Sequence, residues 1–191
     1  MGRRLLIVPI VHTEGELGSE GGAHRAGVIA RHGDRFWAER EALIERYWRA
    51  VREALLGLPI AFDRVKIYQD SLPDGPGAER LVEDMASNGS PNHRLLQLLR
   101  GRGATIVGTE SLVLLLEEYQ AVKERRASPE LMSASLAARD RHIAGRIAET
   151  LGQDEVGILF IGAAHDVARF CDPTIAVAVL SSGASQNRDR P

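Results

Sequence analysis

The chain has 191 residues, a formal net charge of -2, 44% hydrophobic residues and 26% charged residues, which is ordinary for one globular domain. This charge balance excludes an electrostatic case for nucleic-acid binding by the chain as a whole. The single cysteine, Cys171, excludes an intrachain disulfide framework, and no apolar run approaches the ~20 residues that cross a bilayer. We therefore expect a cytoplasmic protein with no nucleic-acid partner and no membrane partner.

Apolar runs alternate with helical patterns along the chain. Strands are expected at 5–11, 65–68, 104–108, 157–161 and 174–180. Helices are expected at about 34–56, at 79–87, after Ser90-Pro91, from Ser111 and from Ser128-Pro129. This alternation predicts a single α/β domain over 1–180 with a mainly parallel sheet flanked by helices, and a disordered tail over 181–191.

Two further segments carry specific expectations. Residues 15–33 are rich in glycine and predict a long loop, which is either a lid over a site, hinged at Gly21-Gly22, or a loose connection. The helix that begins at Ser111 is expected to direct inward Leu112, Leu115, Leu116, Tyr119 and Val122.

Charged residues interrupt the apolar stripe of the helix that follows Ser128. Asp140 falls on the stripe, four residues after Leu136, and Arg139 lies beside it. A charge on an inward face costs several kcal/mol unless it is paired or hydrated. Either the two side chains form a buried salt bridge that ties this helix to a neighbour, or they line a cavity.

Histidines and carboxylates follow the predicted strands. His12 comes directly after the first strand, and His165 follows the strand that ends at Gly162. Asp70 and Glu110 leave the second and third strands. In a parallel sheet these residues emerge at one edge, where they can hold a divalent metal or supply a general base and its orienting partner.

Three more residues are candidates with an ordinary alternative. Glu14 and Glu16 share a face only if their segment is extended, and such carboxylates are more often solvated loop residues. His142, three residues after Arg139, either faces the same cavity or is a surface histidine.

Two motifs carry a family resemblance. The segments Ala138-Arg139-Asp140-Arg141-His142-Ile143-Ala144 and Leu159-Phe160-Ile161-Gly162-Ala163-Ala164-His165-Asp166-Val167 resemble the C-terminal part of TraB-domain proteins. That group belongs with the TIKI proteases, the erythromycin-esterase-like proteins and the ChaN-like proteins. Its members carry an Arg-Asp or Arg-Asn pair in a helix, then a strand ending in Gly-x-x-His, and another Gly-x-x-His on the first strand, where this chain has Pro9 in place of the glycine.

The resemblance implies hydrolysis of an amide or ester bond in a small molecule or peptide, with or without a divalent metal ion. It implies catalytic roles for His12, His165 and Arg139, with Glu110 or Glu14 as the carboxylate, and Arg139 is then placed to stabilise an oxyanion. His12, His165 and Glu14 are the candidate metal ligands. The candidate substrate contacts are Glu14, Glu16, Asp70, His142 and Gly162.

Two other functions remain open from the sequence. The first is a non-catalytic module that binds a metal, a haem-like ligand or a small anion, with the 15–33 segment as a clamp. The second is an interaction protein whose buried charges only fix the fold. The oligomeric state also stays open, with a homodimer as one candidate.

Overall fold

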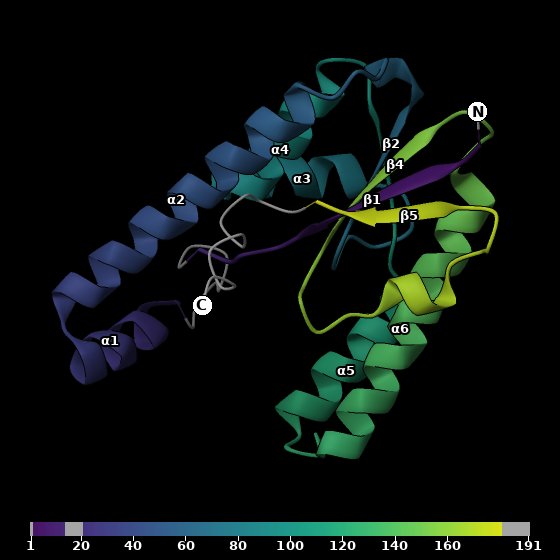
Figure 1. Ribbon diagram of the computed structural model, residues 1–191. Helices are drawn as coiled ribbons and strands as arrows, with labels where there is room; N and C mark the ends of the chain where they lie inside the picture. Colours follow the sequence, from purple (N-terminus) through teal and green to yellow (C-terminus); the bar gives the residue numbers. More distant parts are fainter. Residues whose placement is uncertain (1, 14–20, 181–191) are drawn as a thin grey trace, which may run out of the picture.

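The computed structural model describes residues 2–13 and 21–180. Within them, a five-stranded sheet has the strand order β3-β2-β4-β1-β5, and every neighbouring pair is parallel (Figure 1). The strands are β1 (Arg4–Pro9), β2 (Val65–Gln69), β3 (Thr105–Val107), β4 (Val156–Ile161) and β5 (Ala176–Val179).

Helices follow most of the strands and cover both faces of the sheet. They are α1 (Gly21–His32), α2 (Asp34–Leu56), α3 (Ala78–Ser87), α4 (Pro91–Arg100), α5 (Leu112–Lys123) and α6 (Pro129–Thr150), with short 3-10 turns at Phe62–Arg64 and Val167–Phe170. The predicted α/β fold with a mainly parallel sheet is therefore confirmed. The predicted tail, 181–191, lies outside the described residues.

Strand β4 is the centre of the core, because all six of its residues are buried. Ile158 and Phe160 point to one face of the sheet, and Leu159 and Ile161 point to the other. The near-continuous apolar run is what a strand covered on both faces requires. Each side chain of this kind contributes about 1.5–3 kcal/mol when it is fully buried.

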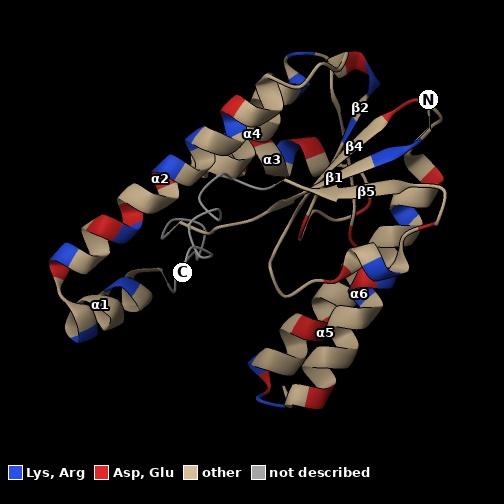
Figure 2. Ribbon diagram, in the orientation of Figure 1, with Lys and Arg blue, Asp and Glu red and all other residues tan. Residues whose placement is uncertain are grey.

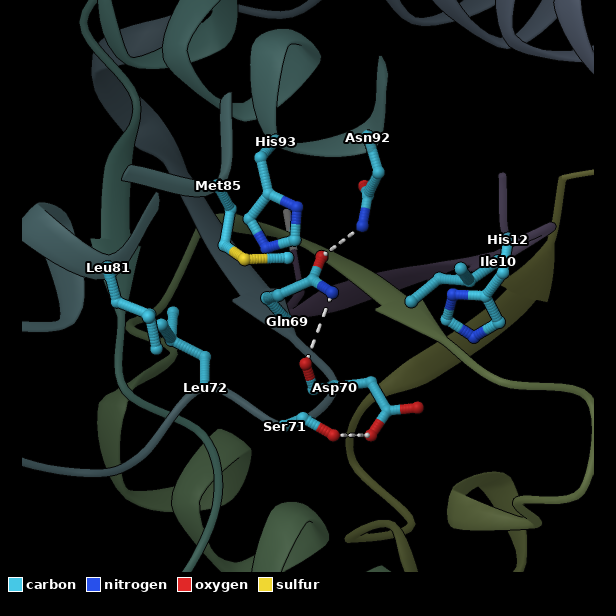
Figure 3. A pocket seen from close by; sticks show the side chains of 10 residues that line it. All are labelled: Ile10, His12, Gln69, Asp70, Ser71, Leu72, Leu81, Met85, Asn92 and His93. Carbon is cyan, nitrogen blue, oxygen red and sulfur yellow. Dashed lines mark hydrogen bonds between the residues drawn. The ribbon is translucent and has the colours of Figure 1, made fainter. Parts of the chain in front are cut away.

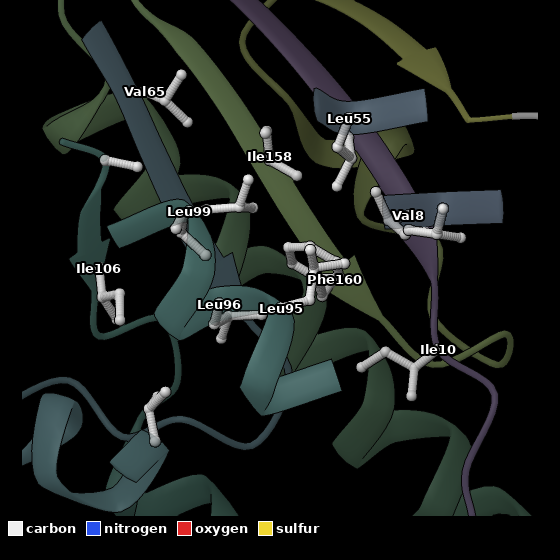
Figure 4. Close-up of a cluster of buried hydrophobic side chains, with 14 of the residues drawn as sticks. Val8, Ile10, Leu55, Val65, Leu95, Leu96, Leu99, Ile106, Ile158 and Phe160 are labelled. Carbon is white, nitrogen blue, oxygen red and sulfur yellow. The ribbon is translucent and has the colours of Figure 1, made fainter. Parts of the chain in front are cut away.

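Each face of the sheet has its own apolar layer. Helices α2, α3 and α4 pack on the face of Phe160, with Leu55, Val82 and Leu96 among the contributors (Figure 4). Helix α6 covers the opposite face through Ile143 and Ile147. Figure 1 shows the two groups of helices on opposite sides of the strands. The central strand β4 is thus covered on both faces, whereas most of the edge strand β5 is exposed.

Serine caps begin three of the helices where the sequence predicts them. The hydroxyls of Ser90, Ser111 and Ser128 accept hydrogen bonds from backbone N–H groups three residues later. Pro91 and Pro129 occupy the first helical position, where a missing N–H costs nothing. These caps fix the starts of α4, α5 and α6.

The predicted loop over 15–33 is wrong for most of its length, because residues 21–32 form α1. Aromatic contacts hold this helix on α2: His24 lies 6.2 Å from Trp37, and His32 lies 4.8 Å from Phe36, between ring centroids. Apart from Gly21, Val28 and Ile29, the residues of α1 are exposed. The part of the proposed lid over 14–20 lies outside the described residues.

The predicted inward stripe of α5 is also wrong, except for Leu115, which is half-buried. Leu112, Leu116, Tyr119 and Val122 are exposed by 53%, 49%, 63% and 55%. Helix α5 packs on α6, and its inward side carries Glu118, which binds Arg139 of α6.

Acidic and basic side chains both occur along α2, whereas α1 carries arginine but no acidic residue (Figure 2). Pairs such as Arg35 with Glu39 and Arg100 with Glu79 account for part of this pattern. No helix in the described ranges is long and apolar enough to cross a membrane.

Candidate functional site

Polar residues from four segments meet beyond the carboxyl ends of the strands. Asp70 directly follows β2, and Gly162 directly follows β4. Because Pro9 of β1 pairs with Ile161 of β4, His12 and Gly162 leave neighbouring strands at the same edge. Ligand sites of open parallel sheets form at this edge.

Arg139 of α6 is the hub of the site. Its Nε and Nη2 donate to the two carboxylate oxygens of Glu110 at 3.2 and 2.5 Å. Nη2 also donates to Asp70 Oδ1 at 2.9 Å, and Nη1 donates to both oxygens of Glu118 at 3.3 Å. The guanidinium is 7% exposed, so three carboxylates share one buried cation.

The charge of Arg139 is secured by these partners. Burial alone lowers the pKa of the guanidinium, but the hydrogen bonds and charge of Glu110, with Asp70 and Glu118, outweigh burial and raise the pKa. Arg139 therefore stays charged, and its donors are committed. We expected this side chain to stabilise an oxyanion; its geometry instead makes it the group that positions Asp70 and Glu110.

Close contact between two loops places Glu110, whose side chain is fully buried. A Cβ on Gly108 would lie 2.5 Å from the carbonyl oxygen of Pro73, so only glycine lets the segments meet. Thr109 and Glu110 then donate backbone hydrogen bonds to Leu72. This arrangement carries the carboxylate from the end of β3 to Arg139.

Asp140, the neighbour of Arg139, orients His165. Its Oδ1 lies 2.5 Å from His165 Nδ1, and its Oδ2 accepts from the backbone N–H of Asp166 at 2.9 Å. Both side chains are nearly buried, with exposures of 3% for Asp140 and 5% for His165. A carboxylate held at both oxygens fixes the rotation of the imidazole ring.

The other imidazole nitrogen faces Asp70. His165 Nε2 lies 3.7 Å from Asp70 Oδ2, and that oxygen accepts from the backbone N–H of Gly162 at 3.0 Å. Gly162, expected as a substrate contact, is thus a support for Asp70. The result is a line of side chains that runs from Asp140 through His165 and Asp70 to Arg139.

A hollow of about 330 Å³ opens beside Asp70. Its described lining has four apolar residues, Ile10, Leu72, Leu81 and Met85, and six polar residues, His12, Gln69, Asp70, Ser71, Asn92 and His93. Ile10 lies beside His12, away from Leu72 and Leu81 (Figure 3). His12 is exposed and shares this hollow with Asp70. Asp70 is therefore the residue that joins the hollow to the Arg139 and His165 network.

The remaining sequence candidates lie elsewhere. His142 is on α6 outside the hollow, and its Nε2 is buried with no hydrogen-bond partner among the described residues. Glu14 and Glu16 lie outside the described residues. The structure thus brings together Asp70, Glu110, Arg139 and His165, with His12 on the wall of the adjoining hollow.

A metal ion is the first ligand to test against this donor set. Asp70, Glu110 and His165 each offer a ligand atom within 4.8 Å of the others, and these donor types suit Zn²⁺ or Mn²⁺. Both oxygens of Glu110, however, accept from Arg139. A divalent cation at this point would lie against a guanidinium, so the arrangement fits an ion-pair network and does not fit a resident metal.

Two parts of the site escape sequence reasoning. Glu118 lies in α5, whose apolar residues were expected to form the inward side. Nothing in the sequence marks Glu118 except its position in the helix that begins at Ser111. Asn92 is 1% exposed and donates to Gln69 at 2.9 Å, although a polar residue in the first turn of a helix is usually at the surface. The motif around Gly162 and His165 gave the clearest signal, because polar residues there interrupt an apolar pattern.

The resemblance to TraB-domain proteins and their relatives therefore stays a prediction drawn from two short motifs. Its Arg-Asp pair and its Gly-x-x-His are brought together, since Asp140 and His165 are hydrogen-bonded. Comparison with known proteins adds no relative: no family model, no curated protein and no solved structure matches the chain.

Proposed function

We propose that the protein hydrolyses an ester or amide bond, with His165 as the general base. The observation that supports this proposal is the alignment of Asp140, His165 and Asp70, in which a buried carboxylate orients an imidazole toward a second carboxylate. A base held by an orienting partner is the arrangement that general-base catalysis requires. The adjoining hollow would hold the substrate in contact with Asp70.

The tautomer of His165 determines which ring nitrogen acts as the base. Asp140 Oδ1 can only accept a hydrogen bond, so His165 Nδ1 carries the proton, and in the neutral ring Nε2 presents a lone pair. Nε2 and Asp70 Oδ2 are then two acceptors 3.7 Å apart, which is too far for a hydrogen bond between them. A water molecule that donates one O–H to each acceptor would satisfy both.

The reaction proposed from this placement needs no further reagent. The water oxygen bonds to the carbonyl carbon while its proton passes to His165 Nε2, and the carbonyl electrons move to oxygen. Collapse of the tetrahedral intermediate breaks the ester or amide bond, and the proton moves from Nε2 to the leaving oxygen or nitrogen. His12, on the wall of the hollow, is the candidate donor to the oxyanion.

The experiment is a hydrolysis screen with short acyl esters and with peptide amides that carry a chromogenic leaving group. His165→Gln should lower kcat/KM about 10²–10⁴-fold for any active substrate, because it removes the base. Arg31→Gln, at an exposed position of α1, is the control and should keep full activity. Equal activity of wild type and folded His165→Gln would overturn the proposal.

A second candidate function is binding without turnover. It is favoured by Asn92 Oδ1 beside the hollow, a buried acceptor with no partner in the part of the chain that the structure describes. A protein of this kind would retain a small ligand and hydrolyse nothing in the screen. The two candidates separate on one measurement, namely release of product at a rate that depends on His165. For either candidate we propose the cytoplasm as the location, since the one cysteine suits a reducing compartment.

A further inference from the structure

The described residues that line the hollow beside Asp70 include no lysine and no arginine, and Asp70 lies on its wall. Sites for carboxylate or phosphate groups supply guanidinium or ammonium donors. Arg139 cannot serve this purpose, because its Nε, Nη1 and Nη2 already bind carboxylates.

The surrounding charge is also negative. Asp70, Glu110, Glu118 and Asp140 lie in one connected network with the single guanidinium of Arg139. Four carboxylates against one guanidinium leave a net charge of about -3 before any charge on His165 is counted, and a low-dielectric surround spreads that field into the hollow. An anionic ligand would be repelled there, and a cationic ligand would be attracted.

Asn92 adds an acceptor that lacks a donor. The backbone carbonyl of Asp70 accepts from Gln69 Nε2 at 3.1 Å, which fixes the Gln69 amide so that its Oε1 faces Asn92. Asn92 Nδ2 donates to that oxygen at 2.9 Å, so the Asn92 orientation is fixed in turn (Figure 3). Asn92 Oδ1 is then a buried acceptor with no partner among the described residues. Such an atom costs about 1–3 kcal/mol unless a donor reaches it.

The apolar side chains of the lining suit an aliphatic chain. Leu72, Leu81 and Met85 lie on one side of the hollow and Ile10 lies beside His12 (Figure 3), and the methionine side chain adapts to different shapes. Pockets that bind small ligands combine such apolar side chains with a few directed polar groups.

We infer that this hollow is the recognition subsite of the proposed hydrolase and that it takes an apolar group bearing a nitrogen donor, with an ammonium preferred over a neutral amide and a carboxylate rejected. The inference rests on the proposed function only in calling the occupant a substrate. Binding itself is independent of turnover.

Three probes with one chain length test the inference: n-hexylammonium, hexanamide and hexanoate, titrated into the full-length protein at pH 7 by calorimetry and by amide chemical-shift changes. The ammonium should bind at least tenfold more tightly than hexanoate, with hexanamide between them. Equal affinity of the three probes, or tighter binding of hexanoate, would overturn the inference.

Matched variants locate the binding. Leu81→Trp fills the mouth of the hollow and should abolish binding of the ammonium, whereas Leu43→Trp on exposed α2 should leave it unchanged. Met85→Trp is the second blocking variant if Leu81→Trp does not fold. Binding that survives both substitutions would place the ligand elsewhere and contradict the inference.

Different results would contradict the proposed function and the proposed subsite. Ammonium-selective binding without hydrolysis of any substrate would remove the proposed function and keep the subsite. Hydrolysis that depends on His165 but favours anionic substrates would keep the function and overturn the subsite.

Discussion

Asp140 and His165 stand 25 positions apart in the chain, and a 2.5 Å contact joins Asp140 Oδ1 to His165 Nδ1. Helix α6 supplies the carboxylate, and the segment after β4 supplies the imidazole. The second oxygen of Asp140 is held by the Asp166 N–H, so the carboxylate cannot rotate away. The base of the proposed reaction is therefore fixed before a substrate arrives.

Replacing Asp140 by asparagine should show whether Asp140 orients His165 or contributes to substrate binding. The side-chain amide of the Asp140→Asn variant can present an N–H to the ring, which favours the wrong tautomer of His165. We expect kcat to fall about 10²–10⁴-fold with little change in KM, and the pH–rate profile of kcat to shift. Asp84→Asn, on the exposed side of α3, is the control and should leave both constants as in wild type. A change confined to KM would assign Asp140 to substrate binding.

Removing the hub cation should destabilise the fold. Arg139→Met leaves Glu110, which is 0% exposed, without its partner, and an uncompensated buried charge costs about 3–5 kcal/mol. Urea unfolding measures the loss. The double variant Arg139→Met/Glu110→Gln removes both charges and should recover part of the stability. If the double variant is less stable than Arg139→Met, the carboxylate is not what the arginine compensates.

Gly108 and Gly145 should respond to alanine in opposite directions. A Cβ at Gly108 would meet the Pro73 carbonyl oxygen at 2.5 Å, so Gly108→Ala should lower stability and displace Glu110. A Cβ at Gly145, within α6, meets nothing within 4 Å, so Gly145→Ala should raise stability by up to about 1 kcal/mol through helix propensity. Thermal melts of the two variants give the comparison. A stabilising Gly108→Ala would show that the two loops do not meet.

The stability of the protein at alkaline pH should depend on the ionisation of Tyr68. Burial raises the pKa of this phenol to about 12, although its hydrogen bond with Thr150 acts to lower the pKa. The unfolded chain loses this proton near pH 10 and the folded protein does not, so stability is complete below pH 10 and falls by about 1.4 kcal/mol per pH unit from 10 to 12.

Tyr68→Phe lacks that titration. It should be less stable than wild type at pH 8, since the bond to Thr150 is lost, and the difference should shrink or reverse by pH 12. Denaturant unfolding at fixed pH values provides the measurement. A difference that stays constant from pH 8 to 12 would mean that the Tyr68 pKa is ordinary in the folded protein.

Metal removal should have no effect on the wild-type protein. Because Arg139 binds both oxygens of Glu110, we expect EDTA to leave melting and turnover unchanged and Zn²⁺ titration to show no tight site. Arg139→Met releases the carboxylates and should create a Zn²⁺ site from Asp70, Glu110 and His165. Stoichiometric metal in purified wild type would reverse this assignment.

Local chemistry made most of the fold predictable. The serine–proline pairs that begin at Ser90 and Ser128 predict helix starts, and the apolar run of β4 predicts a strand covered on both faces. The prediction for residues 21–32 failed because glycine content suggested a loop, while contacts with α2 decide the conformation. Propensity is a weak guide wherever packing supplies more energy.

Two signals made parts of the site predictable: charges that interrupt an apolar stripe, and polar residues such as Asp70 and Glu110 that follow predicted strands. Arg139 and Asp140 stood out on an apolar stripe, and His165 stood out after a buried strand. The partners of Arg139 lie 21, 29 and 69 positions away, and no spacing rule connects residues at such separations. Glu118 was therefore missed, and with it the outward turn of the apolar residues of α5.

The strand order affects how the chain folds during its synthesis on the ribosome. Strand β1 pairs with β4 and β5, and β2 lies between β3 and β4. The first strand to be synthesised therefore cannot form its pairs until β4 and β5 have been synthesised. At about 5–20 residues per second, translation delays that pairing by roughly 8 to 30 s. During this interval β1 and β2 present unpaired edges, and nascent chains that stall before β4 should be preferred clients of chaperones and proteases.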